Sequence, residues 1–308
     1  YPRLRIARDL LSEDGVIFIS IDNNESHNLR KICDEIYGES NFISELIWER
    51  TFSPKNDSIH ISDNHDTILV YSKRNTNGLL NRLPRSEAVD SRYKNLDNDS
   101  RGPWMSDNMT AKTVSEQYLY GIETPSGRIV YPAAGRSWFT SKENMDKLIA
   151  DNRVWFGSDG NNVPRLKRFL SEVQNGVVQT SILFHKEAGH NQEGRQELKK
   201  LMGGEGVFDS PKPVRLIERL IHLGSKCDSI VLDFFSGSAT TAHSIMKINA
   251  EDGGNRKFIM IQLPEMVDLK SDAYKMGFID ICEIGKERIR RAGKQILEEN
   301  KQRKLTDD

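Results

Sequence analysis

Residues Val231–Met246 read "VLDFFSGSATTAHSIM", and this stretch changes character in its middle. It begins as an apolar run, passes through Asp233 and the turn residues 236–238, and continues with apolar residues at helical spacing. Gly237 has no Cβ, so the backbone can approach a ligand closely there. The first amide groups of the following helix would face the same point. The stretch therefore predicts a strand, a tight turn and a helix of an α/β sheet, with a ligand site at the turn.

Two observations restrict the kind of ligand. The sequence contains neither the G-x-x-x-x-G-K-[ST] pattern of a P-loop nor the full G-x-G-x-x-G pattern of a dinucleotide site. Asp233, at the strand tip, is unfavourable beside a phosphate and suits a cationic or hydroxyl-bearing ligand, such as a sulfonium with an amino-acid tail. The turn alone is equally compatible with an ordinary strand–helix connection.

Helical and strand patterns alternate on both sides of a central stretch in which the periodicity is lost. We expect helices at 3–11, 23–38, 213–225, 239–250 and 281–300, and strands at 16–22, 42–50, 66–74, 229–235 and 256–265. The run 16–22 is almost continuously apolar, which is typical of a parallel strand buried on both faces. From about residue 75 to 175, turn formers mix with tryptophans and arginines. This stretch predicts an inserted, largely β or irregular module with one helix near 141–152.

The composition is that of a folded protein with no sign of a membrane segment. The 308 residues carry a net charge of −1, with 37% hydrophobic and 29% charged residues. No run approaches the roughly 20 apolar residues of a membrane-spanning helix, and no secretory leader opens the chain, so we expect a cytoplasmic protein without a membrane partner. The three cysteines are far apart, and the paired histidines lack the other residues of a metal motif, so neither a disulfide nor a metal is expected.

Five segments together resemble a known family. With "VLDFFSGSATTAHSIM", the segments "RLRIARDLLSEDGVIFISIDNNE" (3–25), "NHDTILVYSK" (64–73), "FDSPKPVRLIERLI" (208–221) and "FIMIQLPE" (258–265) resemble, in this order, the β-class DNA amino-methyltransferases that use S-adenosylmethionine. The nearest form is the modification (Mod) subunit of type III restriction–modification systems. The resemblance implies an α/β fold with a doubly wound, Rossmann-like methyltransferase sheet and an inserted α+β target-recognition region. It divides the chain into a catalytic-side part (1–74), the insert (75–200) and the cofactor-binding part (201–308).

The resemblance also assigns cofactor residues. It implies that one group of residues lines the turn, a second group closes over the methionine end of S-adenosylmethionine, and a third group binds the ribose. These are Asp233, Phe235, Ser236, Gly237 and Ser238 for the turn, Ser210, Lys212 and Pro213 for the methionine end, and Gln262 and Glu265 for the ribose. Ala239 stands where the family often has a second glycine, which tightens the turn.

The family's catalytic tetrapeptide, Asp/Asn/Ser-Pro-Pro-aromatic, is absent from these residues. The family places it before the segment that opens this chain, so we expect it upstream of Tyr1 and assign no catalytic residue. The resemblance implies methyl transfer to the N6 amino group of adenine in a specific DNA site, and a fragment that is inactive alone. Cytosine-N4 methylation, a non-catalytic DNA-binding or assembly module, and an unrelated nucleotide-binding enzyme such as an oxidoreductase remain alternatives.

The insert is the expected target-recognition region, because base contacts need arginines and amides on loops. Arg136, Asn161, Asn162, Arg165, Lys167 and Arg168 are the candidate DNA-binding residues. For Trp138, Trp155 and Phe156 we favour a small core, since large aromatic residues are usually buried. The basic segment 285–295 fits nucleic-acid binding no better than a solvated helix face with ion pairs. Partners implied by the resemblance are double-stranded DNA, a second copy of the chain and a restriction (nuclease/helicase) subunit.

Overall fold

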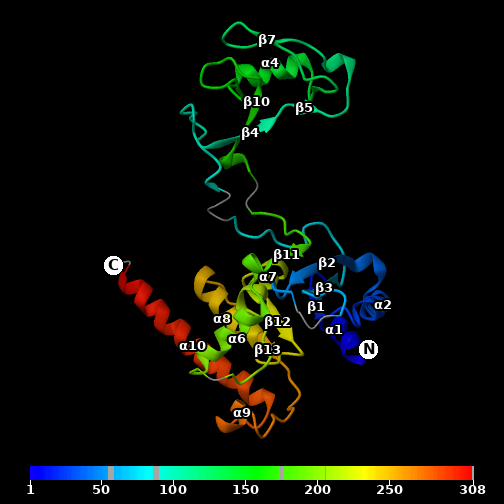
Figure 1. Ribbon diagram of the computed structural model, residues 1–308, viewed down its shortest axis with the longest axis vertical. Helices are drawn as coiled ribbons and strands as arrows, with labels where there is room; N and C mark the ends of the chain where they lie inside the picture. The colour runs from blue at the N-terminus through cyan, green and yellow to red at the C-terminus, as the bar shows by residue number, and fades with distance from the viewer. Residues whose placement is uncertain (55–58, 86–89, 174–175, 205, 307–308) are drawn as a thin grey trace. The chain divides into compact units, whose positions relative to one another are not determined.

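The computed structural model describes residues 1–308 except 55–58, 86–89, 174–175, 205 and 307–308. The chain forms two compact units, which are coloured along the sequence in Figure 1. Unit 1 contains Tyr1–Leu83 and Val178–Asp308, and unit 2 contains Pro84–Val177. Residues 75–83 and 178–200, which the sequence assigned to the insert, therefore belong with unit 1. Within the described residues, no helix has both the length and the apolar character needed to cross a membrane.

Unit 1 is a mixed α/β structure, which confirms the fold class. Its N-terminal part contains α1 (Pro2–Leu10), β1 (Val16–Ile21), α2 (Ser26–Tyr37), β2 (Phe42–Glu49) and β3 (His65–Ser72). Its C-terminal part contains β11 (Ile182–Leu183), α5 (His185–Ala188), α6 (Asn191–Leu201), α7 (Val214–Gly224), β12 (Ile230–Asp233), α8 (Thr240–Asp252), β13 (Lys257–Met260), α9 (Asp272–Lys275) and α10 (Ile281–Thr306).

The larger sheet of unit 1 corrects one sequence expectation. Its strand order is β1-β3-β2-β11, and β1 pairs antiparallel with β3, from Val16 opposite Ser72 to Ile21 opposite Thr67. The parallel pairing expected for residues 16–22 is therefore wrong. The apolar run does not specify the direction of the neighbouring strand, and β1 is half-buried rather than buried on both faces. The strand β3 lies between β1 and β2 and is buried from Asp66 to Ser72.

The second sheet of unit 1 contains the stretch 231–246. β12 and β13 pair in parallel, from Ile230 opposite Lys257 to Asp233 opposite Met260, and α8 connects them. Ile221 of α7 packs with Ile245 and Ile248 of α8 in one buried cluster, which fixes these helices to each other. The predicted strand–turn–helix–strand unit is confirmed, and its turn lies at the carboxyl end of β12.

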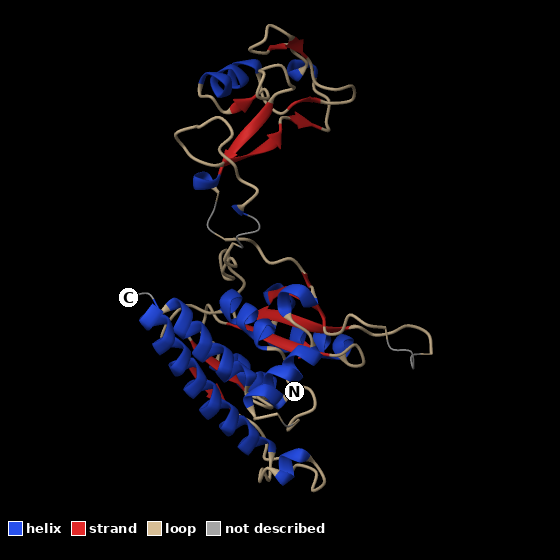
Figure 2. Cartoon of the chain, turned by 60° about the vertical axis from the view of Figure 1, so that its left-hand side comes forward, coloured by secondary structure: helices blue, strands red, loops and turns tan. Residues whose placement is uncertain are grey.

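Unit 2 is dominated by short strands, as Figure 2 shows. Among the described residues they are β4 (Trp104–Asn108), β5 (Thr110–Ala111), β6 (Ile122–Glu123), β7 (Ile129–Val130), β8 (Ser137–Trp138), β9 (Val154–Trp155) and β10 (Arg165–Phe169), with the helix α4 (Lys142–Ala150). Trp138 and Phe156 lie in the buried cluster of this unit, which confirms them as core residues. Trp155 is only half-buried.

Candidate functional site

The turn between β12 and α8 is held by side chains that the sequence singled out. The Asp233 carboxylate accepts hydrogen bonds from the Phe235 amide (3.2 Å) and from the Thr241 hydroxyl (2.6 Å). The Gly237 amide donates to Oε1 of Gln262 (2.8 Å), at the end of the neighbouring strand. The fold thus brings Asp233, Gly237 and Gln262 together at one point beyond the carboxyl ends of two parallel strands.

Two residues of the turn adopt positive φ. Gly237 has φ +49°, and a Cβ at this position would lie 3.4 Å from the ring of Phe208. Ala239 has φ +59° and ψ +40°, the left-handed conformation, directly before α8. The tightening of the turn by Ala239 stays a prediction, and the structure adds that Ala239 precedes α8 in this conformation. Phe208, which faces Gly237, is the first residue of the segment 208–221 but was not predicted as a site residue.

A buried arginine lies behind the turn. Arg288 of α10 is fully buried, and its Nη1 donates to the hydroxyls of Ser238 (3.0 Å) and Thr240 (2.7 Å). Its Nε and Nη2 are buried without a hydrogen-bond partner in the described part of the chain. Burial lowers the pKa of Arg288 to about 10.

Sequence reasoning missed Arg288 because both interpretations of the segment 285–295, nucleic-acid binding and a solvated helix face, place its charges at the surface. The spacing of Ile284, Arg288 and Ala292 is a signal that could have found it, since residues four apart share one helix face and all three are buried.

The segment 210–213 reaches the same turn through its backbone. The Thr240 hydroxyl donates to the Lys212 carbonyl (3.2 Å), while the Lys212 ammonium lies 2.7 Å from Asp66 and over the ring of Trp48. Pro213 is buried and caps α7, and Ser210 is exposed.

The remaining predicted cofactor residues differ in their exposure and in whether they are hydrogen-bonded within the turn. Phe235 is 63% exposed, with the guanidinium of Arg3 5.4 Å from its ring centre. The Ser236 amide donates to the Ile261 carbonyl at 3.2 Å, so Ser236 belongs to the bonded turn. Glu265 is exposed on the loop after β13. Of the two ribose candidates, only Gln262 is bonded to the turn in the structure.

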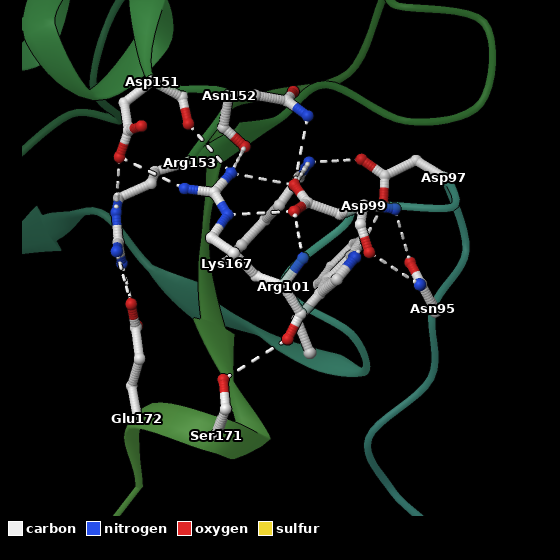
Figure 3. Close-up of polar contacts among 11 residues, drawn as sticks. Asn95, Asp97, Asp99, Arg101, Asp151, Asn152, Arg153, Lys167, Ser171 and Glu172 are labelled. Atoms are coloured by element: carbon white, nitrogen blue, oxygen red, sulfur yellow. Dashed lines mark hydrogen bonds and ion pairs between the residues drawn. The ribbon is translucent and has the colours of Figure 1, made fainter.

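In unit 2, a network of charged groups joins the loop before β4 to β10 (Figure 3). The side chain of Lys167 is fully buried and forms ion pairs with Asp97 and with Asp99 (3.4 Å). Arg101 donates to Asp99 at 2.8 Å, and this hydrogen bond is the main cause that holds the pKa of Asp99 well below its usual range. The Lys167 ammonium is therefore enclosed by carboxylates, and its predicted contact with a phosphate does not fit this structure.

The other predicted DNA-binding residues fall into two groups. Arg136, Asn161 and Arg168 are engaged with neighbouring side chains, namely Thr110, Ser126 and Asp107. Asn162 and Arg165 instead line a surface cavity of about 350 Å³. Asn161 and Asn162 are adjacent in sequence, yet Asn161 bonds to a neighbouring side chain and Asn162 lines the cavity.

The comparisons with known proteins cover nearly the whole chain. The family model described as "DNA methylase", of the N6 and N4 type, matches residues 1–294. The chain is 37% identical to the StyLTI Mod subunit, a type III restriction–modification protein of Salmonella typhimurium, over 97% of this chain and 45% of that protein. It is 32% identical to the EcoPI Mod subunit of Escherichia phage P1, over 96% of this chain and 49% of that protein. It is 31% identical to the type II methyltransferase M.KpnI of Klebsiella pneumoniae, over 92% of this chain and 70% of that protein. The chain spans about half the length of the two Mod subunits.

Proposed function

Because the chain belongs to the N6/N4 DNA methylase family, we propose that it forms part of a site-specific DNA methyltransferase that uses S-adenosylmethionine and acts on the N6 amino group of adenine. The observation that carries the proposal is the turn at Asp233, Gly237 and Gln262. It combines a carboxylate, a position without Cβ and an amide at the carboxyl ends of two parallel strands.

The residues present fit the cofactor. Gly237 supplies the positive φ of the turn, with the ring of Phe208 3.4 Å from the place that a Cβ would take. The buried charge of Arg288 behind the turn favours an anionic group such as the cofactor's carboxylate. Gln262 would hold the ribose through hydrogen bonds, with exposed Glu265 as the second candidate. The segment 210–213 would close over the methionine end. Bound there, the cofactor supplies a sulfonium methyl group.

The chain's own residues would fix the position of the cofactor. Asp233 ties the turn to the start of α8, and Arg288 holds the hydroxyls of Ser238 and Thr240. A rigid turn contributes to rate by orienting the donor towards the amine. The 308 residues contain no two adjacent prolines, so the tetrapeptide that accepts the amine would have to come from elsewhere in the protein. We therefore expect these residues alone to bind the cofactor and not to transfer the methyl group.

A calorimetric titration tests the cofactor proposal. S-adenosylmethionine should bind the wild-type chain, and Asp233→Asn should weaken binding about tenfold, because the neutral amide loses charge-assisted hydrogen bonds that organise the turn. Asp228→Asn is the matched control, since Asp228 is an exposed acid on the loop before β12. No heat of binding from a folded wild-type sample would remove the cofactor from the proposal.

The reaction and the base are tested on the full-length protein. Duplex DNA is incubated with S-adenosylmethionine carrying a labelled methyl group and then digested to nucleosides. N6-methyladenine is the expected product. Detection of N4-methylcytosine would instead show that cytosine is the target base. DNA binding without any methylated nucleoside would favour the non-catalytic module.

The same family membership supports a proposal for partners. The two Mod subunits named above belong to type III restriction–modification enzymes. We expect the full-length protein to pair with a second copy and with a restriction subunit. Light scattering of the purified protein, alone and with the product of a neighbouring restriction gene, measures both associations.

A further inference from the structure

Unit 2 carries a cavity of about 350 Å³ beside β4, β9 and β10. Its lining includes Trp104 and Trp155, whose ring centres are 5.3 Å apart, and the cations Arg92, Lys94 and Arg165. No carboxylate is among the described residues that line it. This volume is at the lower end of the range of small-molecule pockets, so it suits a single small group rather than a whole helix.

The cavity is bordered by more positive than negative charge. Arg92, Lys94 and Arg165 are exposed, and within the described residues none of them forms an ion pair, although the charge of Arg165 helps to lower the pKa of Asp107 on the neighbouring strand. By contrast, Arg101 and Lys167, in the adjoining network, are paired with carboxylates. The rim of the cavity is therefore a local excess of positive charge within a chain of net charge −1.

The aromatic wall is held in place by the strands. Trp155 of β9 lies opposite Arg165 of β10, and opposite residues of an antiparallel pair have side chains on one face of the sheet. The Trp104 indole donates to Asp97 (2.7 Å), and Trp104 is only 3% exposed, so it forms the floor. Trp155 is half-buried and forms the accessible wall.

One amide completes the rim. Gly157 has φ +88°, and a Cβ there would come within 2.3 Å of the Asn162 amide nitrogen. The glycine thus allows the Asn162 side chain to lie at the cavity, where an amide can both donate to and accept from a base edge.

We propose that this cavity holds one unstacked nucleotide of the DNA substrate. The base contacts the Trp155 ring and the Asn162 amide, and the flanking phosphates contact Arg92, Lys94 and Arg165. Aromatic stacking and cationic contacts with phosphate are the two interactions by which proteins hold single nucleotides without a duplex groove. The inference rests on the proposed function, because DNA is the source of the nucleotide.

The test uses the full-length protein and two fluorescein-labelled duplexes of one mixed sequence, one fully paired and one with a central adenine mismatch. A mismatched base is easier to unstack, so the wild-type protein should bind the mismatched duplex several-fold more tightly. Trp155→Ala should lose this preference and weaken binding to the mismatched duplex about tenfold, whereas Trp155→Phe should keep both. Equal unfolding temperatures show that the variants are folded.

The charges are tested by the salt dependence. Arg92→Gln with Lys94→Gln should lower the slope of log Kd against log salt by about two. Lys112→Gln with Lys147→Gln is the control, because it removes two exposed charges of unit 2 that do not line the cavity. Equal slopes for the two double variants would overturn the phosphate contacts, and a mismatch preference retained by Trp155→Ala would overturn the base contact.

Two further outcomes identify where the idea fails. If free deoxyadenosine monophosphate binds the wild type, does not bind Trp155→Ala, and leaves DNA binding unaffected, the cavity is a site for a free nucleotide and the DNA source is wrong. If the wild-type protein binds neither duplex at low salt, the proposed function itself fails. If the wild-type protein binds DNA and the substitutions at Trp155, Arg92 and Lys94 change neither the mismatch preference nor the salt dependence, only the inference about the cavity is overturned.

Discussion

Ala239 adopts a left-handed backbone conformation that an alanine seldom takes up, and it does so at the base of the candidate cofactor turn. This conformation costs an L-residue about 1–2 kcal/mol, so the surrounding contacts must hold it. The Ala239 side chain is buried, and its Cβ would be 3.4 Å from a Cβ placed on Gly285 of α10. The turn is therefore fixed by α10 twice, through Gly285 and through Arg288.

Substitutions at Ala239 should reveal this conformation. We expect Ala239→Gly to change the free energy of unfolding by less than about 1 kcal/mol, because relief of the left-handed conformation offsets the lost methyl burial and the freer unfolded chain. Ala239→Val should cost more than about 2 kcal/mol, since a β-branched residue fits this region poorly. Urea unfolding measures both. Ala250→Gly, in the last turn of α8, is the control and should cost up to about 1 kcal/mol; an equal or larger cost at Ala239 would contradict the assignment.

His243 of α8 gives unit 1 a pH dependence. Burial, with the nearby charges of Arg288 and Lys247, lowers the pKa of His243 from 6.5 to about 3. The unfolded chain therefore binds a proton between these values while the folded chain does not, so stability is lost as the pH falls from 6.5 towards 3.

Urea unfolding at pH 7 and pH 5 measures this effect. His243→Gln should reduce the loss of stability by up to about 1.4 kcal/mol per pH unit in this window. His27→Gln, at an exposed histidine, should behave as the wild type. The same pH dependence in His243→Gln and in the wild type would show that another group is responsible.

At the scale of a single element, the basic residues of β10 look equivalent in sequence but have different surroundings in the structure. Arg165 and Lys167 point to one face of the strand, yet Arg165 lines the cavity and Lys167 is buried against Asp97 and Asp99. Arg168 is on the other face and forms an exposed pair with Asp107. The alternation of side chains along a strand explains which face each residue occupies. The carboxylate partners Asp97 and Asp99 explain why Lys167 is buried.

This difference predicts that substitutions at two neighbouring positions lower the stability by very different amounts. Lys167→Met should destabilise unit 2 by about 3 kcal/mol, because it leaves buried carboxylates without their partner. Arg168→Met should change stability by less than about 1 kcal/mol, because an exposed ion pair contributes little. Hydrogen exchange of the β4 and β10 amides in the whole chain measures both effects. Similar protection in the two variants would show that the buried network does not stabilise this sheet.

At the scale of the whole molecule, each unit has its own core, and the sequence located both. The unit-2 cluster around Trp138 and the unit-1 clusters around Leu69 and Ile245 share no residue. The change of texture at about residue 75 marked the first boundary to within ten residues of Pro84. The texture ends at about residue 175, close to Val177, whereas the division at residue 200 that the resemblance implied lies beyond this boundary. Helix α6 was not expected in that interval, because Gly194 and the charged residues of this helix weaken its apolar pattern.

The sequence by itself determined the strand, turn and helix at 231–246, the core aromatics Trp138 and Phe156, and the family, because local spacing and residue type are enough for these. Only the tertiary structure decided the direction of β1 and the surroundings of each charged side chain. Arg288 is buried against Ser238, fifty positions away, and Lys167 against Asp97, seventy positions away. The free energy of a charge depends on its solvation and its partners, and partners so distant in sequence are brought together only by the fold.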